Sequence, residues 1–327
     1  MTRAAPFRSR LRTRVVGSVL VAAVVFACAE LALRALGFAF SPFTHYEQND
    51  WEVFAEGENR VDYWPDPRLF WKLIPSRQVT TAFGAGSWIN AHGMRGPETT
   101  VAKPRGVRRV ITLGDSGTFG WEVPEPECYP RQLEAVLRKA LADDRVEVVN
   151  AGIPGTTSLQ GRRWFESRVV DFEPDVVVLA FGGNDGDRLE VADRARHILP
   201  EQLTLDQVLL TSRVYQLLYK LVAWDARAAL GADKRRWVPR VSVEEFEENY
   251  RAILDRAAAA GAHAVLLARP GPDWTSYREV EMRLARERDL PYLDDGINGH
   301  PPGAQYAQVA QRVAAAILAR GWLGPGA

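Results

Sequence analysis

Residues 109–120 of this 327-residue chain read Arg-Val-Ile-Thr-Leu-Gly-Asp-Ser-Gly-Thr-Phe-Gly. The first five residues form a β-type run, and Ser116 follows closely among small residues. Ligands bind at the carboxyl ends of the strands in open α/β sheets, so a serine at this point is exposed to a ligand. A hydroxyl becomes a nucleophile only where a base and oxyanion donors converge on it. The stretch therefore predicts an α/β sheet and a reactive serine, provided that those partners occur elsewhere in the chain.

The chain from Val107 onward alternates predicted strands with predicted helices. Strands alternating with helices are typical of a parallel sheet with helices on both faces, which predicts a three-layer α/β/α domain. The predicted strands are residues 109–113, 146–150, 176–181, 264–268 and 291–293, and predicted helices are 132–141, 159–170 and 243–260. A last helix is predicted from apolar side chains that recur at steps of three and four, at Tyr306, Val309, Val313 and Ile317.

Three further blocks lie at the ends of predicted strands or just before a predicted helix. They are Asn150-Ala151-Gly152-Ile153-Pro154-Gly155, Phe181-Gly182-Gly183-Asn184-Asp185 and His300-Pro301-Pro302-Gly303. With Gly114-Asp115-Ser116, this ordered set resembles the SGNH (GDSL-type) hydrolases, whose four marker residues are Ser, Gly, Asn and His. The resemblance covers the chain from about Val107 to the C-terminus and implies a flavodoxin-like SGNH fold.

The resemblance implies a role for each marker residue. Ser116 is the expected nucleophile and His300 the expected base. The backbone N–H groups of Ser116 and Gly152 and the side-chain amide of Asn184 are the expected oxyanion hole. No cofactor is implied, and no set of His, Cys and acidic residues has the spacing of a metal site.

The acid of the site departs from the family pattern. Family members usually carry an Asp three residues before the His, but that position here is Ile297. The nearest acids are Asp295 and Asp294. We expect Asp295 to orient the imidazole of His300, because glycines at 296 and 299 allow the chain to bend. The alternatives are Asp294, or a Ser–His dyad without an acid.

Other serine and glycine motifs do not fit. The α/β-hydrolase elbow needs a glycine two residues after the serine, where this chain has Thr118. Chymotrypsin-like proteases share Gly-Asp-Ser-Gly, but their fold is all-β, whereas Ser116 opens a strand–helix series. The glycines at 114, 117 and 120 miss the spacing of a dinucleotide-binding loop. Asp185 and Asp187 are interpreted as turn or surface acids.

The N-terminal region predicts a membrane anchor. Five arginines and no acid precede Val15, and the apolar run from there to Leu33 would span about 28 Å as a helix. Near its far end, Glu30 can pair with Arg34 one turn later. Arginines on the N-terminal flank keep that end cytoplasmic.

The predicted organisation is therefore a basic cytoplasmic tail over residues 1–14 and one transmembrane helix over residues 15–36. Two alternatives remain open. Ala27-Cys28-Ala29 fits the cleavage site of a signal peptide, and Cys28 could be a lipoprotein site. All three interpretations place the body of the protein outside the cytoplasm, in the periplasm or at the cell surface.

The rest of the chain divides into a connecting segment and the catalytic domain. Residues 37–106 are rich in aromatic residues, Pro and Gly without a helical period, which predicts an irregular connecting segment with short strands and turns. Residues 107–327 form the SGNH domain. Its insertion at 187–240 is interpreted either as a helical lid or wall above the site or as a packing insertion. Cys128 is expected to be a packed thiol.

The predicted function is a serine esterase or acyl hydrolase that acts through a Ser116 acyl-enzyme. Its expected substrate is a small acyl group on a cell-envelope glycan or lipid, a class argued from location and family analogy. The formal net charge is zero, so nothing points to a nucleic-acid partner. The alternatives are an O-acyltransferase with the same site and a non-catalytic envelope binding protein with a decayed site.

Overall fold

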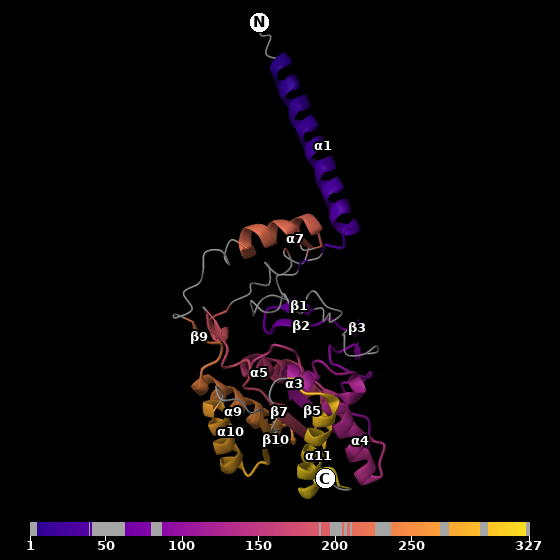
Figure 1. The fold of residues 1–327 in the computed structure, drawn as a ribbon, viewed down its shortest axis with the longest axis vertical. Coiled ribbons are helices and arrows are strands. Elements are labelled where there is room, and N and C mark those ends of the chain that lie inside the picture. The colour runs from indigo at the N-terminus through magenta and orange to yellow at the C-terminus, as the bar shows by residue number, and fades with distance from the viewer. Residues whose placement is uncertain are drawn as a thin grey trace. The chain divides into compact units, whose positions relative to one another are not determined.

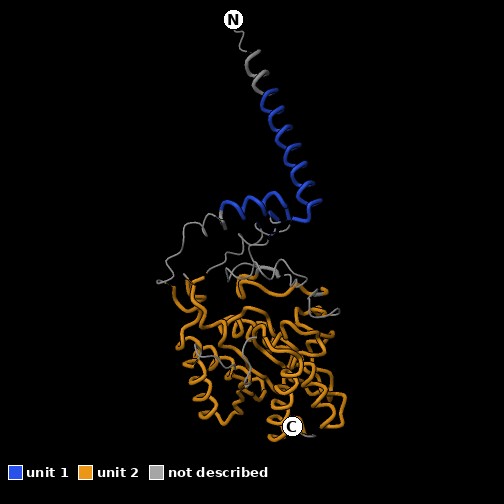
Figure 2. Tube along the Cα trace, viewed as in Figure 1, with its two compact units in different colours: residues 1–46, 199–233 blue, residues 47–198, 234–327 orange. Residues whose placement is uncertain are grey.

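A computed structural model shows a chain of two compact units (Figure 2). Unit 1 comprises residues 1–46 and 199–233, and unit 2 comprises residues 47–198 and 234–327. The structure describes residues 5–38, 40, 63–79, 87–189, 191–196, 205, 208–209, 211–225, 237–268, 275–294 and 300–324.

Unit 2 is built on a sheet of five parallel strands (Figure 1). Their spatial order is β11-β10-β7-β5-β6, so the first strand of the sheet lies between the second and the third. This is the flavodoxin-like doubly wound order, whose switch point lies between β5 and β7. The strands are β5 (Arg108–Gly114), β6 (Val146–Asn150), β7 (Val176–Ala180), β10 (His263–Ala268) and β11 (Tyr292–Asp294).

Helices cover both faces of this sheet, which confirms the predicted three-layer α/β/α architecture. One face packs against α5 (Ser158–Ser167), α9 (Val243–Ala259) and α10 (Thr275–Arg288). The other face packs against α4 (Tyr129–Leu141) and α11 (Gly303–Ala319).

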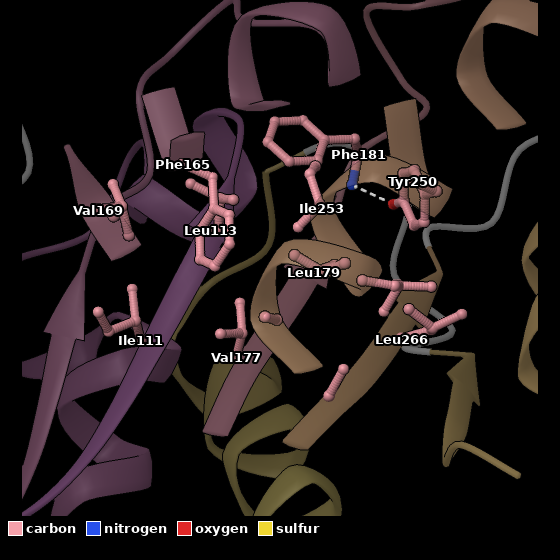
Figure 3. Close-up of a cluster of buried hydrophobic side chains, with 14 of the residues drawn as sticks. Ile111, Leu113, Phe165, Val169, Val177, Leu179, Phe181, Tyr250, Ile253 and Leu266 are labelled. Carbon is pink, nitrogen blue, oxygen red and sulfur yellow. Dashed lines mark hydrogen bonds between the residues drawn. The ribbon is translucent and has the colours of Figure 1, made fainter. Parts of the chain in front are cut away.

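The burial of both faces explains why the strands are almost entirely apolar. Successive side chains of a strand point to opposite faces, so Ile111 and Leu113 enter the core beneath α5 and α9 while Val110 enters the core beneath α4 and α11. Figure 3 shows the first of these cores, in which the N–H of Phe181 donates to the hydroxyl of Tyr250 at 3.0 Å. Each fully buried Val, Leu or Ile contributes about 1.5–3 kcal/mol.

Capping residues define where the covering helices begin. The side chain of Ser242 accepts from the N–H of Glu245, whose carboxylate accepts in return from the Ser242 N–H, and α9 starts there. Helix α4 begins at Tyr129, three residues earlier than predicted, because Pro130 is well suited to the first turn of a helix. Helix α10 was not predicted.

The connecting segment before the sheet contains short strands. Two short antiparallel pairs form, β1 (Tyr63–Asp66) with β2 (Phe70–Leu73) and β3 (Arg77–Val79) with β4 (Ser87–Ile89). Phe70, Trp71, Leu73 and Ile89 pack against Phe119, Trp121 and Ile153 in a third buried cluster. The segment therefore packs against the loops that follow β5 and β6.

The shorter elements of unit 2 lie in its loops. They are α3 (Ser116–Phe119), the 3₁₀ turns Glu125–Glu127, Val169–Phe172 and Asp193–Ala195, and the two-residue strands β8 (Arg188–Leu189) and β9 (Val238–Pro239). The antiparallel pair β8–β9 joins the two ends of the insertion predicted at 187–240.

Unit 1 contains the N-terminal helix and the middle of the insertion. Helix α1 runs over Ala5–Ala35, and its Thr13–Ala35 portion, with a mean hydropathy of 2.4, is long and apolar enough to cross a membrane. Helix α7 (Arg213–Tyr219) continues into a π-helical turn over Lys220–Asp225. The predicted lid role of the insertion stays a prediction.

Candidate active site

Ser116 lies where β5 gives way to α3, at the carboxyl end of the sheet. Asp115 caps the short helix, since its carboxylate accepts from the Gly117 N–H at 2.8 Å. Ser116 is the first residue of the helix, so its own N–H has no intrahelical acceptor. The helix ends at Gly120, whose φ of 83° is in the left-handed region that glycine adopts without strain.

His300 lies against Ser116 although the two are 184 residues apart in sequence. Its Nε2 is 2.8 Å from the Ser116 Oγ, and both side chains are half-buried. His300 lies between β11 and α11, and the amide of Gln132 on α4 donates to the Gly303 carbonyl at 3.1 Å. This bond ties the start of α11 to α4, so the imidazole comes from a well-supported loop–helix junction.

Gly152 approaches the nucleophile's helix closely. A Cβ on Gly152 would be 2.4 Å from the Phe119 nitrogen and 2.8 Å from the Thr118 carbonyl carbon, both backbone atoms of α3. The Gly152 N–H donates to the Asn150 Oδ1 at 3.0 Å. The position therefore excludes a side chain, and in this structure its N–H has a protein acceptor.

Asn184 follows β7 at the same edge of the sheet. Its amide nitrogen donates to the Thr156 carbonyl at 2.9 Å and lies 3.5 Å from the Asp115 Oδ2. The longer contact is at the limit of a hydrogen bond, so one of the two N–H groups is well satisfied and the other only weakly. Asn184 is thus oriented towards the loop that carries Ser116.

Asp295 and Asp294 are the candidate acids for orienting His300. Asp295 lies outside the described residues. Asp294 ends β11, where its carboxylate pairs with the guanidinium of Arg278 on α10. Across the described parts of the chain, no group of three His, Cys or acidic residues could hold a metal ion.

A comparison with known proteins bears on this arrangement. The model of the GDSL-like lipase/acylhydrolase family matches residues 112–321. The chain belongs to this family. It is a hydrolase that acts on ester bonds, as the order of the Ser, Gly, Asn and His blocks indicated.

Individual relatives of this GDSL-type hydrolase are distant. The uncharacterized lipoprotein YqeF of Bacillus subtilis (strain 168) is 32% identical over 90 residues, which are 27% of this chain and 36% of that protein. The match therefore spans about a third of that lipoprotein's length. Among solved structures, the lipase/acylhydrolase from Enterococcus faecalis is 17% identical with a TM-score of 0.44, over 65% of this chain and 97% of that one. The esterase EstA from Pseudoalteromonas sp. is 15% identical with a TM-score of 0.41, over 67% and 100%.

Arg95 supports the nucleophile's helix in this GDSL-type hydrolase. Its buried guanidinium donates to the carbonyls of Phe119, Gly120 and Val123 at 2.6–2.8 Å and to the Ser87 Oγ at 2.6 Å. Burial lowers the pKa of Arg95, but three backbone carbonyls stabilise its charge.

Asp185 is buried, so of its two interpretations, turn acid or surface acid, the structure supports the turn acid. It does close a turn, since its carboxylate accepts from the Gly182 N–H at 3.2 Å. It also accepts from the backbone N–H of Ser158 at 2.9 Å and from the Ser158 hydroxyl, both at the start of α5. Burial raises the pKa of Asp185 to about 7 in spite of these donors. Asp185 thereby joins the Asn184 turn to α5.

A buried ion pair connects the ends of the insertion to the loops around the site. Arg240 and Asp193 approach to 3.1 Å, and both are fully buried. Arg240 also donates to the Gly155 carbonyl at 2.8 Å, and the Thr157 hydroxyl donates to the Asp193 carboxylate at 3.0 Å. These bonds hold in place the loop that contains Thr156, whose carbonyl accepts from the Asn184 amide.

The other described histidines make structural contacts, and both cysteines are free thiols. His92 Nε2 contacts the Thr99 carbonyl at 3.0 Å, and His263 stacks on Trp322. Cys28 and Cys128 are not bonded to each other, and burial raises the pKa of the Cys128 thiol, as expected of a packed side chain. The remaining histidines, His45 and His197, lie outside the described residues.

Proposed function

We propose that Ser116 is the nucleophile of a Ser–His esterase mechanism. The Ser116 Oγ attacks the ester carbonyl while its proton passes to the Nε2 of His300. The tetrahedral intermediate collapses, and the alcohol leaves with the proton that His300 returns. Water then attacks the acyl-enzyme, His300 takes the water's proton, and the acid is released as Ser116 recovers its proton.

The oxyanion of the intermediate would be bound by the N–H groups of Ser116 and Gly152 and by the amide of Asn184. The Ser116 N–H has no intrahelical acceptor, and the second N–H of Asn184 is only weakly satisfied by Asp115. These two donors are poised for a new acceptor. The Gly152 N–H would share its hydrogen bond between Asn150 and the oxyanion, because Asn150 accepts it at 3.0 Å.

Asp295 is our proposed acid for this site. For Nε2 to accept the serine proton, the imidazole carries its proton on Nδ1, and a carboxylate facing Nδ1 stabilises that tautomer and the imidazolium. Asp294 is already paired with Arg278, which favours its neighbour for this task.

The proposed place of action is the cell envelope. The arginines before Val15 would keep the N-terminus of α1 cytoplasmic and place unit 2 on the other side of the membrane. The Bacillus relative is named as a lipoprotein, which is compatible with an envelope location. The substrate would be a small acyl group on an envelope glycan or lipid. An O-acyltransferase would share the first half-reaction, with a sugar hydroxyl in place of water.

One observation favours an active esterase over a binding protein with a decayed site. A 2.8 Å contact between Ser116 Oγ and His300 Nε2 requires two segments 184 residues apart to converge on one point. A binding protein that had lost catalysis would have no need of this convergence.

The test compares Ser116→Ala with Ser167→Ala, whose hydroxyl on α5 donates to the Arg163 carbonyl at 2.6 Å. Ser116→Ala should abolish fluorophosphonate labelling and lower kcat for p-nitrophenyl acetate by several orders of magnitude, whereas Ser167→Ala should match the wild type. Equal activity in Ser116→Ala and wild type contradicts the proposal.

Asp295→Asn should lower kcat at unchanged thermal stability. Loss of activity in Asp294→Asn instead would move the acid by one residue.

A further inference from the structure

The first turn of α7 is bonded to α1 within unit 1. The Glu30 carboxylate of α1 accepts from the backbone N–H groups of Arg213 and Val214, both at 3.0 Å, and from the Ser212 hydroxyl at 2.9 Å. The opening N–H groups of a helix have no intrahelical acceptors and carry partial positive charge, so a carboxylate there stabilises the helix. Glu30 therefore acts as a cap supplied from a distant part of the chain.

Further bonds hold the two segments together. The predicted pair of Arg34 with Glu30 is confirmed at 2.6 Å, and Arg34 also donates to the Thr211 carbonyl at 2.9 Å. Beyond the end of α1, the Phe40 N–H donates to the buried Gln216 side chain at 3.0 Å. The start of α7 is thus attached to the last turns of α1, and its middle is attached to Phe40 just beyond that helix.

This attachment limits the depth that α7 can occupy. Glu30 lies five residues before the end of the candidate span Thr13–Ala35, a rise of about 7.5 Å along the helix. Amphipathic helices in a membrane interface bury their apolar face about 5–10 Å into the boundary between headgroups and acyl chains. If α1 spans a bilayer, the first turn of α7 lies at that depth.

The exposed side chains of α7 suit such a place. Leu218, Leu221 and Val222 are 54%, 53% and 72% exposed, and their spacing of three and four residues places them on one helix face. Upstream, Leu205 and Val208 are 59% and 63% exposed. A run of exposed apolar side chains of this kind is a contact surface rather than an ordinary solvated helix.

We propose that Leu205, Val208 and residues 211–225 lie in the membrane interface as a second contact between unit 1 and the bilayer. Leu218, Leu221 and Val222 would enter the acyl-chain boundary. The occupant of the face is phospholipid, because the hydrogen bonds to Glu30 hold the face at the end of the span. This placement rests on the proposed anchoring of α1 and is independent of the chemistry at Ser116.

The test uses the full chain with Cys28→Ser, reconstituted in vesicles of phosphatidylethanolamine and phosphatidylglycerol. Leu221→Cys, Val21→Cys and Asp144→Cys are introduced one at a time and carry an environment-sensitive fluorophore, and the remaining Cys128 is buried. Spin-labelled lipids then quench from near the headgroup or from the chain end. Val21 is exposed within α1 and reports on anchoring, whereas Asp144 is exposed in the loop before β6 and serves as the aqueous control.

The label at Leu221 should be quenched by the shallow spin label, the label at Val21 by the deep one, and the label at Asp144 by neither. Adding Glu30→Ala should reduce quenching at Leu221 while Val21 is unchanged. Quenching at Val21 without quenching at Leu221 overturns the interfacial placement but leaves the anchor standing, and indicates a protein partner or a second copy on this face. Loss of quenching at both overturns the anchor and the placement together, and leaves the esterase proposal intact.

Discussion

Gly152→Ala tests whether close packing against α3 positions the nucleophile. The added Cβ would lie 2.4 Å from the Phe119 nitrogen, whereas ordinary contacts of this kind begin at 3.4 Å. The obstructing atoms are backbone, so α3 and Ser116 would have to move by about 1 Å, the difference between these distances. A displacement of that size costs about a hundredfold in rate. Overpacking would destabilise the fold by about 1–3 kcal/mol.

The assay is kcat for p-nitrophenyl acetate, normalised to sites labelled by a fluorophosphonate, with urea unfolding measured in parallel. Gly261→Ala is the matched control, because its Cβ meets nothing within 4 Å but its φ of +79° strains an alanine. That variant should lose about 1 kcal/mol of stability and keep its kcat. A folded Gly152→Ala enzyme with the kcat of the wild type would refute the idea that this close approach sets the place of Ser116.

Two further predictions concern buried charges near the site. Arg95→Met leaves the carbonyls of Phe119, Gly120 and Val123 without their guanidinium donor. It should therefore lower the free energy of unfolding by about 3–5 kcal/mol and also lower kcat. Wild-type values in urea unfolding and in the ester assay would show that Arg95 does not support the site. Burial raises the pKa of Asp185 from 3.8 to about 7. Between about pH 4 and pH 7, the folded protein therefore keeps a proton on Asp185 that the unfolded chain has lost. The stability of the wild type should fall as pH rises through this window, by up to about 4 kcal/mol. Asp185→Asn should lack this slope, and melting curves from pH 5 to pH 8 that are parallel for both proteins would contradict it.

Much of the fold was predictable because its signals are local. Four of the five strands are rich in β-branched and aliphatic residues that are mostly buried, and all five lie within one residue of their predicted bounds. Helix α10 was missed because charged residues dominate it, although Tyr277, Val280 and Leu284 recur on its buried face at steps of three and four. That periodicity was the available signal.

Part of the candidate site was predictable for the same reason. Ser116, Gly152 and Asn184 each follow a strand, and the carboxyl ends of parallel strands meet at one edge of the sheet. Their neighbourhood in space therefore follows from strand order. The buried state of Asp185 did not follow, because it depends on Ser158, which α5 brings from another part of the chain.

The sequence by itself determined the alternation of strands and helices, the family, and the identity of the four marker residues. The tertiary structure alone decided that His300 Nε2 meets Ser116 Oγ at 2.8 Å, that Arg95 holds the carbonyls after α3, and that Glu30 caps α7. Periodicity along a chain reports which side of an element is buried. Hydrogen bonds between groups 24 to 184 residues apart depend on the path of the whole chain, and no local pattern encodes that path.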